Sequence, residues 1–205
     1  MKLLIAIPSL DYMHATFVQS LQALTKKLYK DGINFDVMIE TGTLVYAARD
    51  KLSRYAMERD YTHVLWLDSD MVFSESLLDD LMFSGKNFVT GLACSRRPPY
   101  VSCVFKDLIS FERYEEFPSD TFKVAGCGFA CVLISVDILR EVWASFSTCF
   151  CPEKSLGEDL AFCKRARFCN YEIWAEPGAR LGHIGHVPVY PGEHEKYMAG
   201  LGAEK

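Results

Sequence analysis

The alternation of short apolar runs with amphipathic segments in the first half of the chain most strongly limits the folds that it can adopt. The apolar runs span residues 2–8, 34–40, 62–67 and 87–94, and each has the length of a buried strand. Repeated strand–helix–strand units of this spacing predict a parallel sheet with right-handed crossovers. We therefore expect an α/β fold: a single Rossmann-like domain with a mostly parallel central sheet flanked by helices.

The segments between these runs carry the pattern of helices that bury one face. We place helices at residues 15–32, 45–60 and 74–86, where apolar residues recur at intervals of three and four. Gly32 ends the first of them, at a position where glycine commonly terminates a helix. The side chains expected to face the core are Phe17, Leu21, Leu24 and Leu28 in the first helix, and Ala48, Leu52, Tyr55 and Ala56 in the second.

In the second half of the chain the helical spacing of apolar residues stops and later returns. Residues 95–124 are rich in aromatic side chains, and we interpret them as loops and hairpin strands that form a small antiparallel region. A strand and a helix follow within residues 126–146, a further helix begins near Glu158, and a strand spans residues 171–175. After Tyr190 we expect a loosely packed extension.

Composition and charge exclude several classes of protein. The net charge of −5 argues against a broad grip on a nucleic-acid backbone, which needs clustered lysine and arginine. The apolar run in the opening MKLLIAIPSL is too short for a signal peptide, and no run approaches the roughly 20 residues that a membrane-spanning helix needs. We expect a soluble, cytoplasmic protein whose eight cysteines are free thiols. The alternative, a zinc site, would use Cys149, Cys151, Cys163 and Cys169, although these lack a CxxC pair.

Two carboxylates follow the third apolar run directly, in the stretch VLWLDSDMVF. In an extended chain alternate residues point the same way, so Asp68 and Asp70 can converge on one point. Such a pair repels unless a cation holds both groups ionised, and a hard divalent ion, Mg²⁺ or Mn²⁺, prefers these oxygen ligands. Because such ions keep positions open for phosphates, the pattern favours a nucleotide ligand. The alternative is a solvated turn after a buried strand.

Other polar residues lie at the ends of the first two strands. Pro8 and Ser9 follow the first strand, and Glu40 ends the second. In open parallel sheets ligands bind beyond the carboxyl ends of the strands. We therefore expect these residues to lie near Asp68 and Asp70.

A second acidic cluster and a histidine-rich turn occur later in the chain. Glu158 and Asp159 lie in the first turn of the helix that they begin, where the helix dipole alone would also favour them. The segment GHIGH offers His183 or His186 as a nitrogen ligand of the kind that Mn²⁺ accepts beside carboxylates. The remaining histidines are interpreted as structural: His14, His63 and His194.

Four segments in this order resemble the GT-A-fold glycosyltransferases, especially the compact family-2-like members: LWLDSDMVF, GCGFACVLIS, GEDLAFCKRA and LGHIG. The segment YAARDKLSRYAME also resembles the Ala-Arg-Asn helix that precedes DxD in that group, with Asp50 where Asn is usual. The resemblance covers residues 3–187 and implies one glycosyltransferase domain over residues 1–205. Within it, residues 1–94 would form the nucleotide-sugar-binding half, residues 95–187 the acceptor and catalytic half, and residues 188–205 a C-terminal tail.

The resemblance implies a metal-dependent transfer of a sugar from a nucleotide-diphosphate donor, a UDP-sugar, to a hydroxyl acceptor. Asp70 would bind Mn²⁺ or Mg²⁺ directly, while Asp68 would bind the metal, the ribose or a water ligand. His183 would complete the metal shell. Asp159 matches the acid that acts as general base in the inverting members, and Glu158 would hold the donor or acceptor sugar. The donor sugar and the anomeric outcome stay open. The implied donor-binding residues are Pro8, Ser9, Glu40, Arg49, Asp68, Ser69, Asp70, Gly126 and Gly128.

Within that set, Pro8, Ser9 and Glu40 would surround the nucleoside, and Arg49 would reach its base or phosphates. Gly126 and Gly128 would allow the backbone to approach the sugar closely.

Two other functions fit parts of the pattern. A haloacid-dehalogenase-like phosphohydrolase also carries DxD after a strand, and a catalytically inactive sugar-nucleotide-binding protein can have the same fold. The acceptor stays open among a glycan, a protein and a modified nucleic-acid base. Arg96 and Arg97 are expected near phosphates, with a solvated loop as the alternative.

Overall fold

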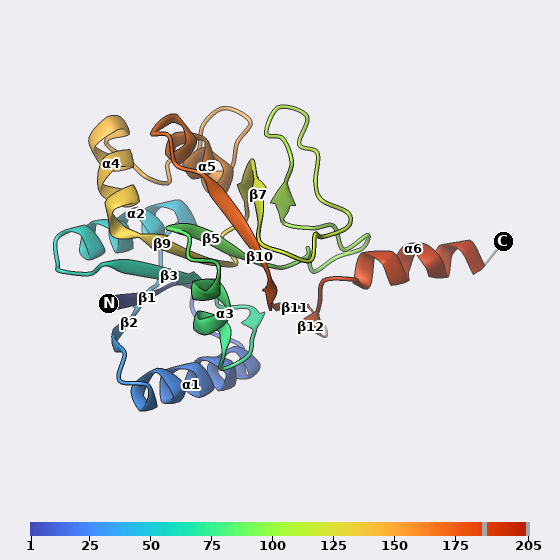
Figure 1. Ribbon diagram of the computed structural model, residues 1–205, viewed down its shortest axis with the longest axis horizontal. Coiled ribbons are helices and arrows are strands. Elements are labelled where there is room, and N and C mark those ends of the chain that lie inside the picture. Colours follow the sequence, from blue (N-terminus) through green and yellow to red (C-terminus); the bar gives the residue numbers. More distant parts are fainter. Residues whose placement is uncertain (186–187, 204–205) are drawn as a thin grey trace.

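A seven-stranded sheet runs through the protein in the order β2-β1-β3-β9-β5-β10-β7, in a computed structural model that describes residues 1–185 and 188–203 (Figure 1). Helices cover both faces of the sheet. Five strands run in one direction, whereas β9 and β7 run in the other, so the expected mostly parallel α/β fold is confirmed. The strands are β1 (Lys2–Pro8), β2 (Asn34–Glu40), β3 (His63–Leu67), β5 (Phe88–Leu92), β7 (Phe122–Val124), β9 (Cys131–Ser135) and β10 (Ile173–Arg180).

The helices divide the hydrophobic core into two layers. Helices α1 and α3 cover one face of the sheet, and α2, α4 and α5 cover the other (Figure 1). In α1, Phe17, Leu24 and Leu28 are buried as expected, because the apolar stripe faces the sheet. The helices are α1 (Ala15–Lys30), α2 (Val45–Met57), α3 (Leu77–Phe83), α4 (Val136–Phe146), α5 (Glu158–Phe168) and α6 (Glu193–Ala203).

Strand β9 lies between β3 and β5 and is antiparallel to both. Its direction follows from where the chain goes after β5. That strand ends at Leu92, at the edge of the sheet where the parallel strands have their carboxyl ends. Residues 93–130, which include β7, return the chain to this edge, where Cys131 of β9 pairs with Leu67 at the end of β3. Since no helix carries the chain back across the sheet, β9 starts there and runs in the opposite direction.

Short antiparallel strands lie beside the main sheet and confirm the expected hairpin region. One small sheet places His183 opposite Met71, directly after the DxD segment. Another pairs Val104 with Cys127. These elements are β4 (Met71–Val72), β11 (Gly182–Ile184) and β12 (Pro188–Val189) in the first sheet, and β6 (Val104–Phe105) and β8 (Gly126–Cys127) in the second.

Strand β10 begins later and extends further than the strand predicted at residues 171–175, so that boundary was wrong. Its pairing with β5 shifts between Ala175 and Arg180, which is the signature of a bulge. The bulged segment contains Pro177, which cannot donate a ladder hydrogen bond. Pairing with both β5 and β7 sustains the strand around this interruption.

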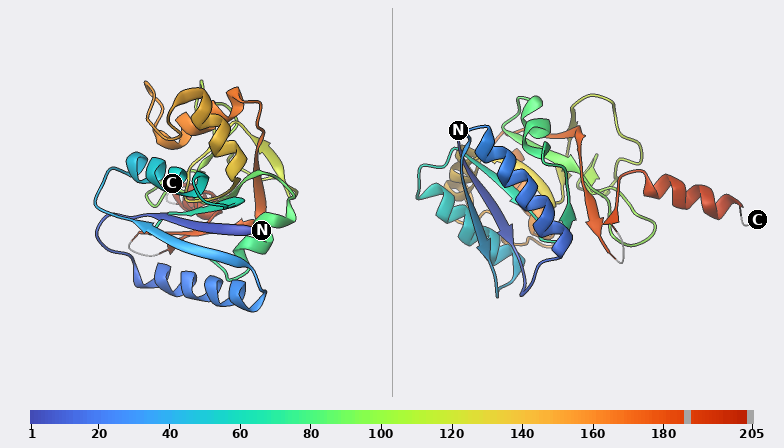
Figure 2. Two further views of the ribbon diagram at one scale, coloured as in Figure 1. Left: turned by 90° about the vertical axis from the view of Figure 1, so that its left-hand side faces the viewer. Right: turned by 90° about the horizontal axis from the view of Figure 1, so that it is seen from below.

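The C-terminal segment contains the helix α6, which sequence analysis did not expect. The helix projects away from the sheet, as the views in Figures 1 and 2 both show. None of the helices in the described part of the chain combines the length and apolarity needed to span a bilayer. The cysteines are free thiols, as expected.

Replacing Gly91 with alanine tests the close approach of β5 to the end of β10. An added Cβ would lie 2.7 Å from Leu181 Cδ1 and 2.8 Å from the Ala179 carbonyl oxygen. Because the backbone oxygen cannot move without distorting the bulge, we expect a loss of about 1–3 kcal/mol in the free energy of unfolding, measured by urea denaturation. The control Gly200→Ala adds a methyl group with no atom within 4 Å and should not destabilise the protein. Equal stability of the two variants would contradict this expectation.

Candidate active site

Arg49 lies at the centre of a cluster of acidic side chains at the carboxyl ends of β1 and β3. The residue comes from α2 and is only 1% exposed. Its Nη2 donates to Asp68 Oδ1 at 2.8 Å, its Nη1 donates to Glu158 Oε1 at 3.1 Å, and Nη1 also pairs with Asp159. One guanidinium therefore joins the DxD segment to the acidic start of α5.

Two buried aromatic rings pack against this guanidinium on its core side. Its central carbon lies 5.2 Å from the ring centroid of Phe129 and 5.8 Å from that of Phe150. These rings pack edge to face against each other and against Trp66. Burial alone would lower the pKa of Arg49, but the three carboxylates outweigh it, so the pKa lies above its ordinary value. The side chain is a permanent, fixed cation.

The neighbouring Asp50 fixes the loop that leads into α5. Its Oδ1 accepts hydrogen bonds from the backbone N–H groups of Cys149 at 2.9 Å and Phe150 at 2.8 Å. Arg165 of α5 donates to the Cys149 carbonyl oxygen at 2.9 Å, so the same loop is held from both sides. This geometry gives Asp50 a positioning role: a carboxylate oxygen accepts two N–H groups here.

Asp159 has both carboxylate oxygens oriented by the protein. Oδ1 pairs with Arg49, and Oδ2 accepts a hydrogen bond from the Phe129 backbone N–H at 3.2 Å. Burial raises the pKa of Asp159 to about 6, and the charges of Asp68 and Glu158 add to the rise, while Arg49 opposes it. A carboxylate with this pKa is ionised at neutral pH and is more basic than an ordinary aspartate, which suits a general base.

Asp70 lies opposite His183, because β4 and β11 pair antiparallel beside it. Its Oδ2 is 3.2 Å from His183 Nε2 and accepts from Arg96 Nη1 at 2.9 Å. Burial acts to raise the pKa of Asp70, but its contacts with His183 and Arg96 lower the pKa below the ordinary value. For His183, burial lowers the pKa, whereas Asp70 and the Cys94 carbonyl oxygen raise it above the ordinary value.

Asp70 and His183 are residue types that can bind a divalent metal. His183 Nδ1 lies 2.9 Å from the Cys94 carbonyl oxygen, so it carries the proton of the neutral ring and leaves the Nε2 lone pair facing Asp70. Two acceptors that face each other require a proton or a cation between them. A carbonyl-oriented imidazole beside a carboxylate is a ligand arrangement that suits Mn²⁺.

The three expected ligands do not form one group. Asp68 Oδ1 is bonded to Arg49, so the cation between the two acidic segments is this guanidinium. Among residues 1–185 and 188–203, no cluster of three or more His, Cys, Asp or Glu side chains has metal-binding geometry. Asp70 and His183 would therefore hold a metal together with groups from a ligand. The alternative ligand His186 lies outside the described residues.

A cavity of about 460 Å³ opens above these groups. Its volume lies in the range of small-molecule sites, about 300–1,000 Å³. Ser9 lies on its floor, with Oγ 3.3 Å from Ser69 Oγ. The sequence-predicted residues that line it are Pro8, Ser9, Arg49, Asp68, Ser69, Asp70, Glu158 and Asp159. Arg96, which we expected near phosphates, also lines it.

Three of the expected donor-binding residues do not line this cavity. Glu40 pairs with Lys51 at 2.7 Å and contributes its carbonyl oxygen to the Ser9 N–H, so it supports the cavity without lining it. Gly126 does not line this cavity: a Cβ there would lie 2.9 Å from Leu108 and 3.2 Å from Leu160 of α5. Gly128 lines a second cavity, which also has Asp159 in its wall.

Much of the cavity wall comes from residues that no sequence motif singled out. The loop after β1 contributes Leu10, Asp11 and Tyr12, and the loop after β2 contributes Thr43. The position of these loops could have indicated that they line the cavity, because both follow the carboxyl ends of parallel strands. His14, which we interpreted as structural, also lines the cavity.

Similar solved structures identify the fold of this chain. No protein-family model matches the sequence, and no curated protein matches it. Among solved structures, A197 from STIV matches with 19% identity and a TM-score of 0.65, over 90% of this chain and 86% of that one. The catalytic domain of Drosophila β1,4-galactosyltransferase 7, in complex with xylobiose, matches with 12% identity and a TM-score of 0.56, over 94% and 68%.

GalNAc-T7 with UDP, GalNAc and Mn²⁺ matches with 9% identity and a TM-score of 0.59. The match covers 97% of this chain and 48% of that one, so the chain spans about half the length of GalNAc-T7. The chain has a GT-A-like fold. At these identities the likeness concerns the fold, and function has to be argued from the site.

Replacing Arg49 with leucine should destabilise the protein strongly. The change leaves Asp68, Glu158 and Asp159 without their shared cation, and breaking a buried ion pair in this way costs about 3–5 kcal/mol. The measurement is urea unfolding at neutral pH.

The matched control is Arg140→Gln, which removes an exposed ion pair with Asp137 and should change stability by no more than about 1 kcal/mol. If both variants lost equally little free energy of unfolding, Arg49 would not organise the cluster.

Proposed function

We propose that this protein is a metal-dependent glycosyltransferase, which transfers a sugar from a UDP-sugar or related nucleotide-diphosphate sugar to a hydroxyl group. The proposal rests on one observation: Asp159 and Asp70 line the same cavity. Asp159 would be the base, and Asp70 is a residue type that binds metals. The GT-A-like fold supports it, since matched structures with this fold are glycosyltransferases.

The donor would lie in the 460 Å³ cavity with its nucleoside between the loops that follow β1 and β2. There Ser9 and Ser69 offer hydroxyl groups, and the half-exposed Arg96 offers a cation to the diphosphate. Asp70 and His183 would hold Mn²⁺ or Mg²⁺, with Asp68 close by. When bound, the ion neutralises charge on the diphosphate leaving group.

Asp159 would act on the acceptor. Its carboxylate accepts the proton of the acceptor hydroxyl while that oxygen forms a bond to the anomeric carbon of the donor sugar. The bond between that carbon and the diphosphate oxygen breaks, and the nucleotide diphosphate leaves with the electron pair. Arg49 and the Phe129 N–H hold the carboxylate in place during this proton transfer. Glu158, beside it on the same guanidinium, would accept hydrogen bonds from sugar hydroxyls.

The decisive experiment incubates the protein with a panel of nucleotide sugars and Mn²⁺ and measures release of the nucleotide diphosphate. Slow hydrolysis of one donor, with water as acceptor, is expected. If the protein bound nucleotide and metal but hydrolysed no donor, the inactive sugar-nucleotide-binding alternative would replace our proposal.

Transfer should depend on pH through Asp159. Because the pKa of this carboxyl is about 6, it is protonated at lower pH and cannot accept the acceptor proton. The ratio kcat/KM should therefore fall about tenfold for each pH unit below that value.

Asp159→Asn should reduce kcat for transfer by about 10²- to 10⁴-fold. The exposed control Asp120→Asn should leave it unchanged. Full activity of Asp159→Asn would remove Asp159 from the mechanism.

Metal binding should depend on the Asp70–His183 pair. Asp70→Ala and His183→Ala should each weaken Mn²⁺ binding in the presence of UDP by at least about tenfold, as measured by calorimetry. His63→Ala, at the start of β3, is the control and should bind Mn²⁺ normally. Unchanged binding by both site variants would place the metal elsewhere.

A further inference from the structure

Glu158 and Asp159 separate the donor cavity from a smaller one. The second cavity has a volume of about 230 Å³ and contains Gly128 and Arg113 in its wall. Asp159 lines both cavities, so a group in either one can reach the same carboxylate. Gly128 lies beside this carboxylate, since a Cβ there would be 3.8 Å from Asp159 Oδ2, at ordinary contact distance.

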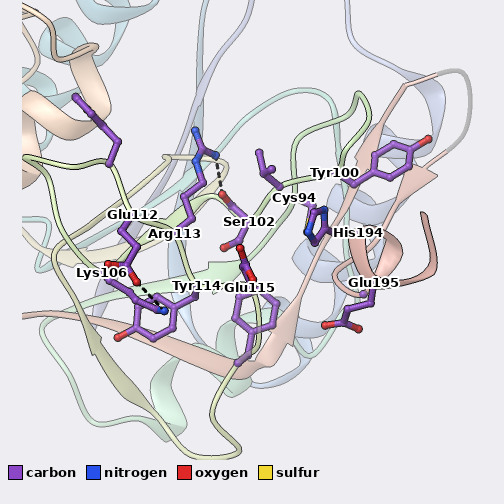
Figure 3. Close-up of a pocket in the computed structure, with 14 residues that line it drawn as sticks. Cys94, Tyr100, Ser102, Lys106, Glu112, Arg113, Tyr114, Glu115, His194 and Glu195 are labelled. Carbon is purple, nitrogen blue, oxygen red and sulfur yellow. Dashed lines mark hydrogen bonds and ion pairs between the residues drawn. The ribbon is translucent and has the colours of Figure 1, made fainter. Parts of the chain in front are cut away.

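Arg113 also lines a third cavity, of about 410 Å³, shown in Figure 3. Its Nη1 donates to the Ser102 carbonyl oxygen at 2.7 Å, and its guanidinium lies 4.5 Å from the ring centroid of Phe105. The second and third cavities therefore share this side chain, and Asp159 lines the second of them. We call the two together the outer groove.

The walls of the outer groove come from two segments that lie far apart in the sequence. Glu112, Arg113 and Tyr114 lie on one side, and Tyr100 and residues from the start of α6 lie on the other (Figure 3). Contacts hold the second side together: His194 bonds to the Pro99 carbonyl oxygen, and Tyr197 packs edge to face on Tyr100 at 5.7 Å. The helix that projects from the fold thus contributes its first turns to the groove.

The groove combines aromatic rings with carboxylates. Tyr100, Phe111, Tyr114 and Phe117 line the third cavity. Aromatic faces of this kind pack against the C–H face of a sugar ring, and tyrosine also offers a polar group. Carboxylates beside them accept hydrogen bonds from sugar hydroxyls.

The charges of the groove disfavour an anionic ligand. Lys106 is paired with Glu112 at 3.0 Å, and Arg113 is occupied by a carbonyl oxygen and an aromatic ring. Glu115 and Glu195 make no ion pair within residues 1–185 and 188–203. In the third cavity three carboxylates therefore face two permanent cations, and the second cavity adds Glu158 and Asp159, which are paired with Arg49. A phosphate or sulfate backbone thus meets a net negative wall.

We propose that the outer groove binds the acceptor and that the acceptor is a neutral oligosaccharide. The proposal rests on the proposed function, since it needs a donor on the other side of Asp159. The terminal hydroxyl of the glycan would enter through the 230 Å³ cavity to reach this carboxylate, and the preceding sugar units would lie along the aromatic wall. The recognition chemistry is the same for a free glycan and for one attached to a lipid or protein.

The test begins with binding of the full chain to an array of neutral oligosaccharides, sulfated oligosaccharides, a short single-stranded DNA and hydroxyl-rich peptides. Free neutral oligosaccharides and lipid-linked versions of the same glycans form separate arms, which distinguish the two sources. Binding of neutral glycans in either arm is expected. Binding confined to sulfated glycans, DNA or peptides overturns the proposal, and so does the absence of binding by every probe.

Variants then locate the binding site. Glu115→Gln should weaken binding of the best neutral oligosaccharide by about tenfold. Tyr100→Ala, on the opposite wall, should weaken it by about three- to tenfold. Glu75→Gln, an exposed carboxylate that lines none of the cavities in this region, is the matched control and should bind normally.

Donor hydrolysis separates failure of this proposal from failure of the proposed function. With water as acceptor, Glu115→Gln and Tyr100→Ala should hydrolyse the donor at the rate of the unchanged protein. Unchanged glycan affinity in both variants would contradict acceptor binding in the outer groove, but it would leave the proposed glycosyltransferase function in place. Absence of donor hydrolysis in the unchanged protein refutes the function itself.

Discussion

The guanidinium of Arg49 places one positive charge among three carboxylates that belong to two distant parts of the chain. Without it, Asp68 would repel Glu158 and Asp159, and the start of α5 could not lie against the end of β3 at low cost. The aromatic rings of Phe129 and Phe150 fix the cation from the side of the core. The geometry of the candidate active site therefore depends on this ion cluster.

Helix α2 connects this cluster to the remainder of the site. Arg49 binds the acidic groups, and Asp50 binds the backbone of the loop before α5, so two consecutive residues set the position of that helix. Asp159 lines both the 460 Å³ cavity and the smaller cavity beside it. In the proposed function, a base that reaches both spaces would serve a direct transfer between two substrates.

Much of the fold was predictable, because burial periodicity is a local property of the chain. The parallel strands and the buried face of α1 followed from it directly. The direction of β9 and the helix α6 did not, because they depend on the path of residues 93–130 and on contacts such as Tyr100 with Tyr197. Gly126 shows the same limit: a motif cannot tell whether a glycine faces a ligand or a neighbouring helix.

The sequence by itself determined that acidic residues follow a buried strand and begin a later helix, and that polar residues occur at strand ends. These facts depend on the order of residue types and on the period of burial. Only the tertiary structure decided which cation meets which carboxylate. Asp68 and Asp70 are two residues apart, yet one binds Arg49 and the other faces His183. Electrostatic pairing depends on distance in space, and the chain sets that distance only when it is folded.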